Sequence, residues 1–199
     1  MKKILVLYGS PMPRETSIST ILMDYFVKEY QESHPEDEII SLDLNMEPMS
    51  TLPLTSANLG SFYNEELSDK YINLLKSVDK VIMNAPMINF NVPATVKNFF
   101  DRISVANKTF SYKYAKNGSS IGLLDHLKIQ IIATQGAPLG WYPWASHVNY
   151  LEGIWNFLGA KVNPTVLLDG VKAEPLNTKS KQELLELKKN ELASLAKEF

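Results

Sequence analysis

The chain has 199 residues, of which 45% are hydrophobic and 21% are charged, as is typical of a soluble globular domain. The 20 lysines and arginines stand against 22 aspartates and glutamates, so the formal net charge is −2 and the cation surplus that nucleic-acid binding requires is missing. Because there is no cysteine, disulfides, thiolate nucleophiles and cysteine-ligated metal centres are excluded.

We also expect neither a targeting segment nor a membrane span. The N-terminal apolar run is too short for the core of a signal peptide, and no uncharged stretch of about 18 residues occurs. We therefore expect a cytoplasmic protein that contacts neither membranes nor nucleic acid and that forms one domain over residues 1–199.

The first part of the chain alternates predicted strands and helices. The apolar run Lys3–Tyr8 predicts a buried strand, and Ser17 precedes a helical stripe that begins at Ile18. A weaker strand follows at Ile39–Leu44, and a stripe of apolar residues over Leu67–Val78 predicts the second helix.

The rest of the chain continues this alternation. The predicted strands are Lys80–Ala85, Lys128–Ala133 and Val162–Leu168. The predicted helices run from Pro93 to Ile103, from Val148 to Leu158 with Gly159 as a stop, and from a capping box at Ser180 and Glu183 to the C-terminus.

Five strands that alternate with five helices predict an α/β fold with a parallel sheet, because parallel strands need crossover connections. The expected architecture is a flavodoxin-like, doubly wound, five-stranded sheet of order 2-1-3-4-5 with helices on both faces. Two segments depart from this plan. Asn45–Asn64 is long for a connection, and Thr109–Gly122 predicts an extra β-hairpin that turns at Asn117-Gly118. Either segment is a candidate cover for a functional site.

Ligands of such sheets bind beyond the carboxyl ends of the strands, where the loop Gly9–Ser19 carries four hydroxyl residues. Around a helix N-terminus these hydroxyls favour a phosphate, although Thr16 or Ser17 could also serve only as a helix cap. Neither G-x-x-x-x-G-K-[ST] nor G-x-G-x-x-G occurs, so a single terminal phosphate suits this loop better than a triphosphate or pyrophosphate.

Two further loops reach the same edge of the sheet. Ala85–Pro93 is apolar except for Asn89 and Asn91, and its prolines predict an extended chain that lies flat along a planar ligand or is merely a rigid joint. Thr134–Tyr142 contains Gly136 and ends in aromatic residues that either stack on a ring or only pack. One hydroxyl-rich loop and two apolar, amide-bearing loops match a phosphate-tailed aromatic cofactor, and FMN fits best.

Several motifs carry a resemblance to a known family. They are Lys3–Leu7 with Ser10, Ser17–Ser19, Ala85–Asn91, Lys97–Asp101, Thr109–Tyr112 with Asn117-Gly118, and Thr134–Ala137. With these motifs the sequence resembles, over essentially its whole length, the FMN-dependent NADH azoreductase (NADH:quinone oxidoreductase) family. That resemblance implies a homodimer that passes two electrons from NADH through FMN to a quinone or azo compound by a ping-pong mechanism.

The resemblance also implies roles for individual residues. Ser10, Ser17 and Ser19, with the backbone of Ile18, would hold the phosphate. Met87, Ile88, Asn89 and Phe90 would line the flavin ring, and Thr134, Gln135, Gly136 and Ala137 would bind its pyrimidine end. The chain departs from the family where Ile88 replaces a frequent tyrosine and where Gln135-Gly136-Ala137 replaces Arg-Gly-Gly, so substrate preference is open.

No side chain is assigned as a catalytic acid or base. Backbone N–H groups over Gln135–Ala137 are the candidates for stabilising the negative charge that develops on the flavin, in the manner of an oxyanion hole. His147 and Tyr142 are the side chains that could supply a proton.

Two other functions fit parts of the sequence. Gly118–Gly122 matches the G-x-S-x-G of serine hydrolases at Ser120, but it lies on a polar turn rather than between a strand and a helix. A flavodoxin-like electron carrier shares the fold, although a net charge of −2 gives little steering of a protein partner. A metal site is not expected, because the three histidines are far apart in the sequence.

Overall fold

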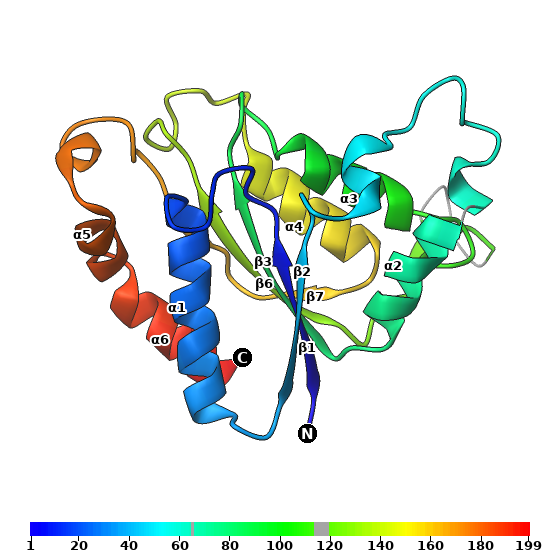
Figure 1. Cartoon of the computed structure of the whole chain (residues 1–199), viewed down its shortest axis with the longest axis horizontal. Helices are drawn as coiled ribbons and strands as arrows, with labels where there is room; N and C mark the ends of the chain where they lie inside the picture. Colours follow the sequence, from blue (N-terminus) through cyan, green and yellow to red (C-terminus); the bar gives the residue numbers. More distant parts are fainter. Residues whose placement is uncertain (65, 114–119) are drawn as a thin grey trace.

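The computed structural model describes residues 1–64, 66–113 and 120–199 (Figure 1). The predicted turn at Asn117-Gly118 and the first two residues of the G-x-S-x-G motif lie outside these ranges. No helix in the described part of the chain is long and apolar enough to cross a membrane.

A parallel sheet forms the centre of the molecule. Its strands are β1 (Lys3–Tyr8), β2 (Glu38–Asp43), β3 (Lys80–Pro86), β6 (Lys128–Thr134), β7 (Lys161–Val162) and β8 (Val166–Leu168). The order is β2-β1-β3-β6-β7, and β8 also pairs with β6. The predicted order 2-1-3-4-5 is therefore confirmed.

The fifth predicted strand is the one that differs. It was expected to be continuous over Val162–Leu168, but the structure divides it into β7 and β8, which pair in succession with β6. Pro164 lies between the two pieces, and its lack of an N–H group prevents it from donating to a ladder of strand hydrogen bonds. The Pro164 carbonyl instead accepts the Gln130 side-chain amide at 3.1 Å.

The α-helices agree with the predicted stripes. They are α1 (Ile18–Ser33), α2 (Glu66–Lys76), α3 (Ala94–Ile103), α4 (His147–Phe157), α5 (Lys181–Glu186) and α6 (Lys189–Glu198). Three short 3₁₀ helices lie at Pro48–Thr51, Phe62–Asn64 and Leu176–Thr178. The capping box at Ser180 and Glu183 is present, but the single C-terminal helix that we expected is interrupted after Glu186.

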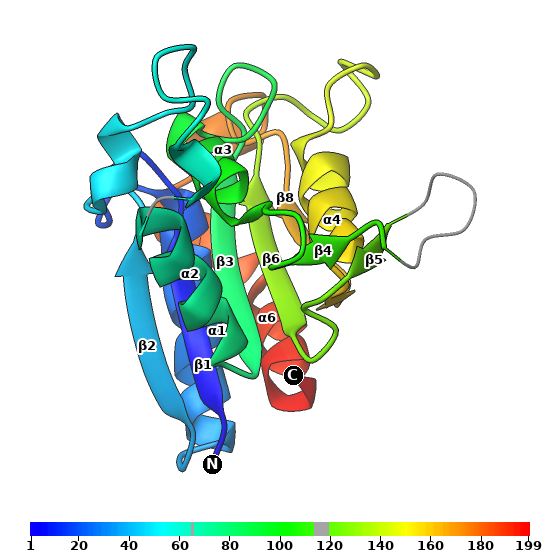
Figure 2. The same cartoon turned by 90° about the vertical axis from the view of Figure 1, so that its right-hand side faces the viewer.

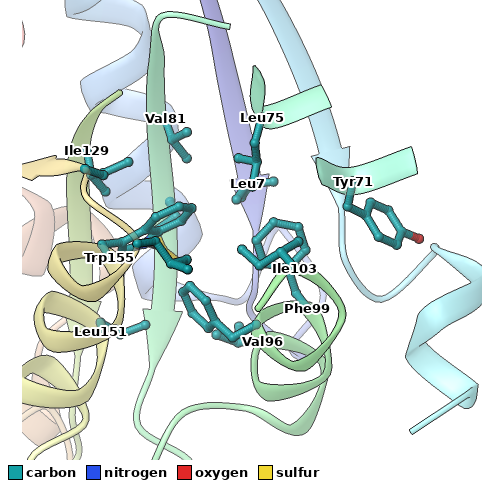
Figure 3. Close-up of a cluster of buried hydrophobic side chains, with 14 of the residues drawn as sticks. Leu7, Tyr71, Leu75, Val81, Val96, Phe99, Ile103, Ile129, Leu151 and Trp155 are labelled. Atoms are coloured by element: carbon teal, nitrogen blue, oxygen red, sulfur yellow. Dashed lines mark hydrogen bonds between the residues drawn. The ribbon is translucent and has the colours of Figure 1, made fainter. Parts of the chain in front are cut away.

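The central strands β1, β3 and β6 are buried on both faces, which explains their apolar runs. Helices α1 and α6 cover one face, where Ile4, Val6 and Ile82 pack, while α2, α3 and α4 cover the other (Figures 1 and 2). Figure 3 shows this second core, in which Leu7 and Val81 from the sheet meet aromatic side chains from the helices. The labelled aromatic residues are Tyr71, Phe99 and Trp155.

The extra hairpin is confirmed as an antiparallel pair of β4 (Phe110–Ser111) and β5 (Ile121–Gly122). Gly122 touches the backbone at the end of α4 so closely that a Cβ there would lie 2.1 Å from the Gly159 nitrogen. Gly159 has φ +95° and ends α4, as its position in the sequence predicts. Two glycines thus let the hairpin dock against the helix end.

The long segment Asn45–Asn64 is ordered where it passes α3. The Arg102 guanidinium is buried, donates to the carbonyls of Phe62 at 3.2 Å and Leu52 at 3.0 Å, and lies 3.7 Å from the centre of the Phe62 ring. The segment is therefore anchored to α3 by an arginine that the sequence pattern alone did not single out.

Candidate functional site

Two adjoining cavities lie where the loops after β1, β3 and β6 meet. The first, here called the hydroxyl cavity, has a volume of ≈ 200 Å³, and the second, the aromatic cavity, ≈ 340 Å³. They share Met87, Gly136 and Lys172. All twelve residues proposed for FMN line one or both: Ser10, Ser17, Ile18, Ser19, Met87, Ile88, Asn89, Phe90, Thr134, Gln135, Gly136 and Ala137.

The hydroxyl cavity is built on the N-terminus of α1. Ser17 is the N-cap: its hydroxyl accepts the Thr20 N–H at 3.3 Å and donates to the Ser10 hydroxyl at 2.8 Å. The Ser19 hydroxyl lies 3.2 Å from that of Ser17. Among the described groups nothing accepts the N–H of Ile18 or Ser19. Unpaired N–H groups, clustered hydroxyls and the positive end of a helix together make an anion site.

Thr16 does not share in the cap. Its hydroxyl donates to the carbonyl of Pro13 at 3.0 Å, within its own loop. Ser17 alone caps α1, and it does so while its hydroxyl stays among those that line the cavity. The capping and binding interpretations of Ser17 are therefore compatible.

Asn84 holds this cluster in place through its hydrogen bonds, a role that the sequence analysis did not predict. It is fully buried in β3, where its Oδ1 accepts the Gly9 N–H at 2.7 Å. Its Nδ2 donates to the hydroxyls of Thr20 at 2.9 Å and Ser19 at 3.3 Å. Gly9 must be glycine, because a Cβ there would lie 2.5 Å from the Asn84 carbonyl oxygen. The only signal in the sequence was a polar residue inside an apolar strand.

Replacing Asn84 by alanine is expected to lower the free energy of unfolding by about 2 kcal/mol. The substitution leaves the buried Gly9 N–H without a partner and opens space beneath the first loop. Urea denaturation of the FMN-free protein measures the change. As a control, Asn156→Ala, on the exposed side of α4, should be close to neutral. Equal stabilities of N84A and N156A would contradict the supporting role of Asn84.

The second loop is a tight turn, which corrects the extended chain expected from its prolines. Ile88 and Asn91 exchange two backbone hydrogen bonds of 2.8 and 3.1 Å. Between them Asn89 has φ 45° and Phe90 has φ 71°, the left-handed pair typical of a type I′ turn. Asparagine tolerates this conformation, but phenylalanine at φ 71° is strained, as residues at functional sites often are. The Met87 N–H donates to the Thr134 carbonyl at 2.7 Å and so holds the loop beside β6.

The third loop is paired with a fourth, residues 169–173 after β8, which the sequence analysis missed. The N–H groups of Gly170, Val171 and Lys172 donate to the carbonyls of Ala137, Gln135 and Gly136, at 3.0, 3.2 and 2.8 Å. These bonds bring Val171, Lys172 and Ala173 into the walls of the cavities.

This pairing also corrects the expected set of backbone donors. The Gln135 N–H is not free, because it donates to the Leu168 carbonyl at 3.1 Å. The N–H groups of Gly136 and Ala137 have no acceptor in the described part of the chain. The Gln135 side chain turns back to donate to the Ala137 carbonyl at 3.0 Å. Of the three backbone N–H groups, those of Gly136 and Ala137 are thus left without an acceptor among the described residues.

Exposed aromatic residues form the rim of the aromatic cavity. The Phe90 ring lies 5.0 Å from Tyr142 and 4.8 Å from Trp144, measured between ring centres. Trp141 and Tyr142 line the cavity, and Trp144 packs on Phe90 while 72% of its surface stays exposed. The second and third loops therefore touch through their aromatic rings.

The two candidate proton donors lie in different surroundings. Tyr142 lines the aromatic cavity, whereas His147 is buried at the start of α4 and is not part of either wall. Burial lowers the pKa of His147 to about 4, and the Ala85 backbone, which raises it, offsets only part of that effect. His147 is neutral at pH 7 and is not positioned to supply a proton to a ligand in the cavities.

The proposed covers lie elsewhere. None of the described residues of Asn45–Asn64 or of the hairpin lines either cavity. Asn45 touches the site only indirectly, by donating from its side chain to the Ser10 carbonyl at 2.8 Å.

The chemistry of these walls fits FMN. The hydroxyl cavity offers three serine hydroxyls and free N–H groups to a terminal phosphate. The aromatic cavity offers apolar side chains to a planar ring and the free N–H groups of Gly136 and Ala137 to its polar edge.

Comparison with known proteins agrees with this geometry. The flavodoxin-like fold family matches residues 2–192. The chain belongs to the flavodoxin-like family. An FMN-dependent NADH:quinone oxidoreductase of Metamycoplasma arthritidis (strain 158L3-1) is 55% identical over 199 residues, with both chains covered in full. A protein of the same name from Mycoplasmopsis pulmonis (strain UAB CTIP) is 52% identical, again over 100% of both chains.

A solved structure gives the same answer for the fold. The azoreductase from Bacillus anthracis str. Sterne is 25% identical to this flavodoxin-like protein and superposes with a TM-score of 0.84, covering 100% of both chains. The family resemblance carried by the sequence motifs is thus confirmed.

Proposed function

We propose that this protein is an FMN-dependent oxidoreductase that transfers two electrons from NADH to quinones or azo compounds. The observation that carries the proposal is a hydroxyl-lined anion site that adjoins an apolar, amide-bearing cavity at the carboxyl edge of a parallel sheet. The full-length relatives named FMN-dependent NADH:quinone oxidoreductase support the same activity. An azoreductase of the same fold supports azo compounds as further acceptors.

Each loop has its own task in this proposal. Ser10, Ser17 and Ser19, with the free N–H groups at the start of α1, hold the phosphate. The residues that line the ring are Met87, Ile88, Asn89 and Phe90. Those at its pyrimidine end are Thr134, Gln135, Gly136 and Ala137.

Bound FMN supplies the redox chemistry, because its ring accepts a hydride from a nicotinamide and passes on two electrons. The chain orients the ring, and the N–H groups of Gly136 and Ala137 donate to its electron-rich edge. Phe90 and Tyr142, whose rings lie against each other, form an apolar part of the wall of the aromatic cavity. We expect NADH and the acceptor to use this cavity in turn, which gives ping-pong kinetics.

The activity is tested with the purified protein. We expect it to take up FMN, to lose its yellow colour when NADH is added without oxygen, and to regain it when a simple quinone follows. Initial rates at several quinone concentrations should give parallel double-reciprocal lines. A protein that takes up no FMN, or whose bound FMN is not reduced by NADH, would overturn the proposal.

This experiment also separates the two rivals. An electron carrier would bind FMN but would not be reduced rapidly by NADH alone. A serine hydrolase needs a strand before its nucleophile and a helix after it, whereas Ser120 is followed directly by β5. A fluorophosphonate probe should therefore leave Ser120 unlabelled.

We further propose that residues 1–199 form one FMN-binding domain that works as a homodimer in the cytoplasm. Exposed Trp141 and Trp144, beside the aromatic cavity, give a second copy an apolar surface to cover. A chain without cysteine suits a reducing compartment. Light scattering of the FMN-loaded protein measures the oligomeric state.

A further inference from the structure

Lys172 carries a formal positive charge in the wall of the candidate site. Of the described residues that line the hydroxyl and aromatic cavities, none other than Lys172 is an acid, a lysine or an arginine. It lines both cavities, at the boundary marked by Gly136. The formal charge of these walls therefore comes from one side chain that the sequence motifs did not include.

The backbone of Lys172 is fixed to the third loop. Its N–H donates to the Gly136 carbonyl at 2.8 Å, and the neighbouring Gly170 N–H donates to the Ala137 carbonyl at 3.0 Å. On the other side of this turn, the Asp169 side chain accepts the Leu139 N–H at 2.6 Å. These hydrogen bonds hold the loop that carries Lys172 at a fixed position relative to the N–H groups of Gly136 and Ala137, which we propose to donate to the ligand.

The stem of the side chain runs along Gly136, and its charged end is free. A Cβ built on Gly136 would lie 3.0 Å from Cδ and 3.3 Å from Cγ of Lys172. The ammonium has no hydrogen bond and no ion pair within the described ranges, whereas the cations of neighbouring surface cavities are paired, Lys97 with Asp101 and Arg14 with Asp24. A lysine without a partner is available to an anion in the cavity.

We propose that Lys172 supplies the positive charge that stabilises the electron-rich form of the bound flavin and thereby sets its reduction potential. This inference rests on the proposed function. Hydride transfer from NADH adds two electrons and one proton to the cofactor, releases NAD⁺ and leaves one additional negative charge in the site. A single nearby cation favours that form over the oxidised one.

The size of the effect follows from the exposure of Lys172. Lys172 is exposed, and screening by solvent limits its interaction with a charge in the cavity to the range of surface ion pairs. We expect Lys172→Gln to weaken binding of reduced relative to oxidised FMN by about fivefold. For a two-electron couple this corresponds to a midpoint potential lower by about 20 mV. Lys172→Glu, which reverses the charge, should lower it by about twice as much.

The test is the midpoint potential of the FMN-loaded protein, measured by equilibration with a reference dye at mildly alkaline pH. Lys172→Arg should keep the wild-type potential. Lys161→Gln is the matched control, because it removes an equal charge from β7 at the opposite edge of the sheet. The shift in K172Q should shrink between about 0.01 M and about 1 M salt, where the screening length falls from about 30 to about 3 Å.

Each outcome decides the proposal. A graded fall from wild type through K172Q to K172E, absent in K161Q, supports it. Potentials that are equal in wild type and K172Q overturn it. So does a K172Q variant that binds FMN more weakly but riboflavin normally at an unchanged potential, because Lys172 would then serve the phosphate. If the wild type itself takes up no FMN, the proposed function fails as well.

Discussion

Replacing Ser17 by aspartate is expected to weaken FMN binding by at least about 100-fold while helix α1 keeps its N-cap. In the unsubstituted protein the Ser17 hydroxyl accepts the Thr20 N–H and lies 2.8 Å from the Ser10 hydroxyl. Aspartate caps helices as well as serine does, but it places a negative charge at the proposed phosphate site. Two unit charges about 4 Å apart repel by about 4 kcal/mol at an effective dielectric constant of about 20.

Ser17→Asn is the matched control for this substitution. Asparagine has the shape of aspartate and is also a good N-cap, but it carries no charge, so its FMN affinity should fall by less than about tenfold. Quenching of flavin fluorescence measures the affinities for FMN and for riboflavin, which has no phosphate. Thermal melts of the FMN-free proteins check the cap. If S17D loses riboflavin as strongly as FMN, the hydroxyl cluster is not a phosphate site.

Most of the fold could be predicted from local patterns, because its strands are buried on both faces and its helices carry one apolar stripe. Leu7 and Val81 lie in central strands that are buried on both faces, so the apolar runs Ile4–Leu7 and Val81–Met83 are uninterrupted. The break between β7 and β8 is harder to predict, because apolar residues resume after Asn163-Pro164-Thr165 with Val166–Leu168. Here one missing N–H group outweighs the hydrophobic pattern.

A residue of the candidate site could be predicted where its role depends on the residues next to it in the sequence. Ser17 caps the helix that follows it, so a serine before an apolar stripe was a sufficient signal. Asn84 acts through contacts with residues at least 64 positions away, and Lys172 reaches the site because its loop pairs with Gly136. Such contacts arise only when the sheet is assembled, and no local pattern encodes them. The turn at Phe90 was mispredicted because phenylalanine rarely occupies a left-handed position.

Acid is expected to destabilise the protein through His147, by about 3 kcal/mol between pH 6.5 and pH 4. Burial lowers the pKa of His147 from its ordinary value of 6.5 to about 4, so over this range the unfolded chain binds a proton that the folded protein resists. The contribution to stability is fully present above about pH 6.5 and is lost progressively as the pH falls towards 4. Urea denaturation at a series of pH values measures this slope.

His147→Leu should remove the slope without weakening the protein at pH 7. Neither ring nitrogen of His147 makes a hydrogen bond of normal geometry with a described residue, and the Ala85 backbone offsets only part of the effect of burial on its pKa, so little is lost when an apolar side chain replaces the ring. Asp37 and Glu183 also have lowered pKa values, so both residues contribute to the loss of stability in acid. Wild type and H147L share this contribution, and it cancels when the slope of one protein is subtracted from that of the other. Asn156→Leu, at an exposed position of α4 that carries no titratable group, is the control and should keep the wild-type slope. A slope that H147L retains in full would mean that the imidazole accepts a proton in the folded protein, and the loss of stability in acid would not come from His147.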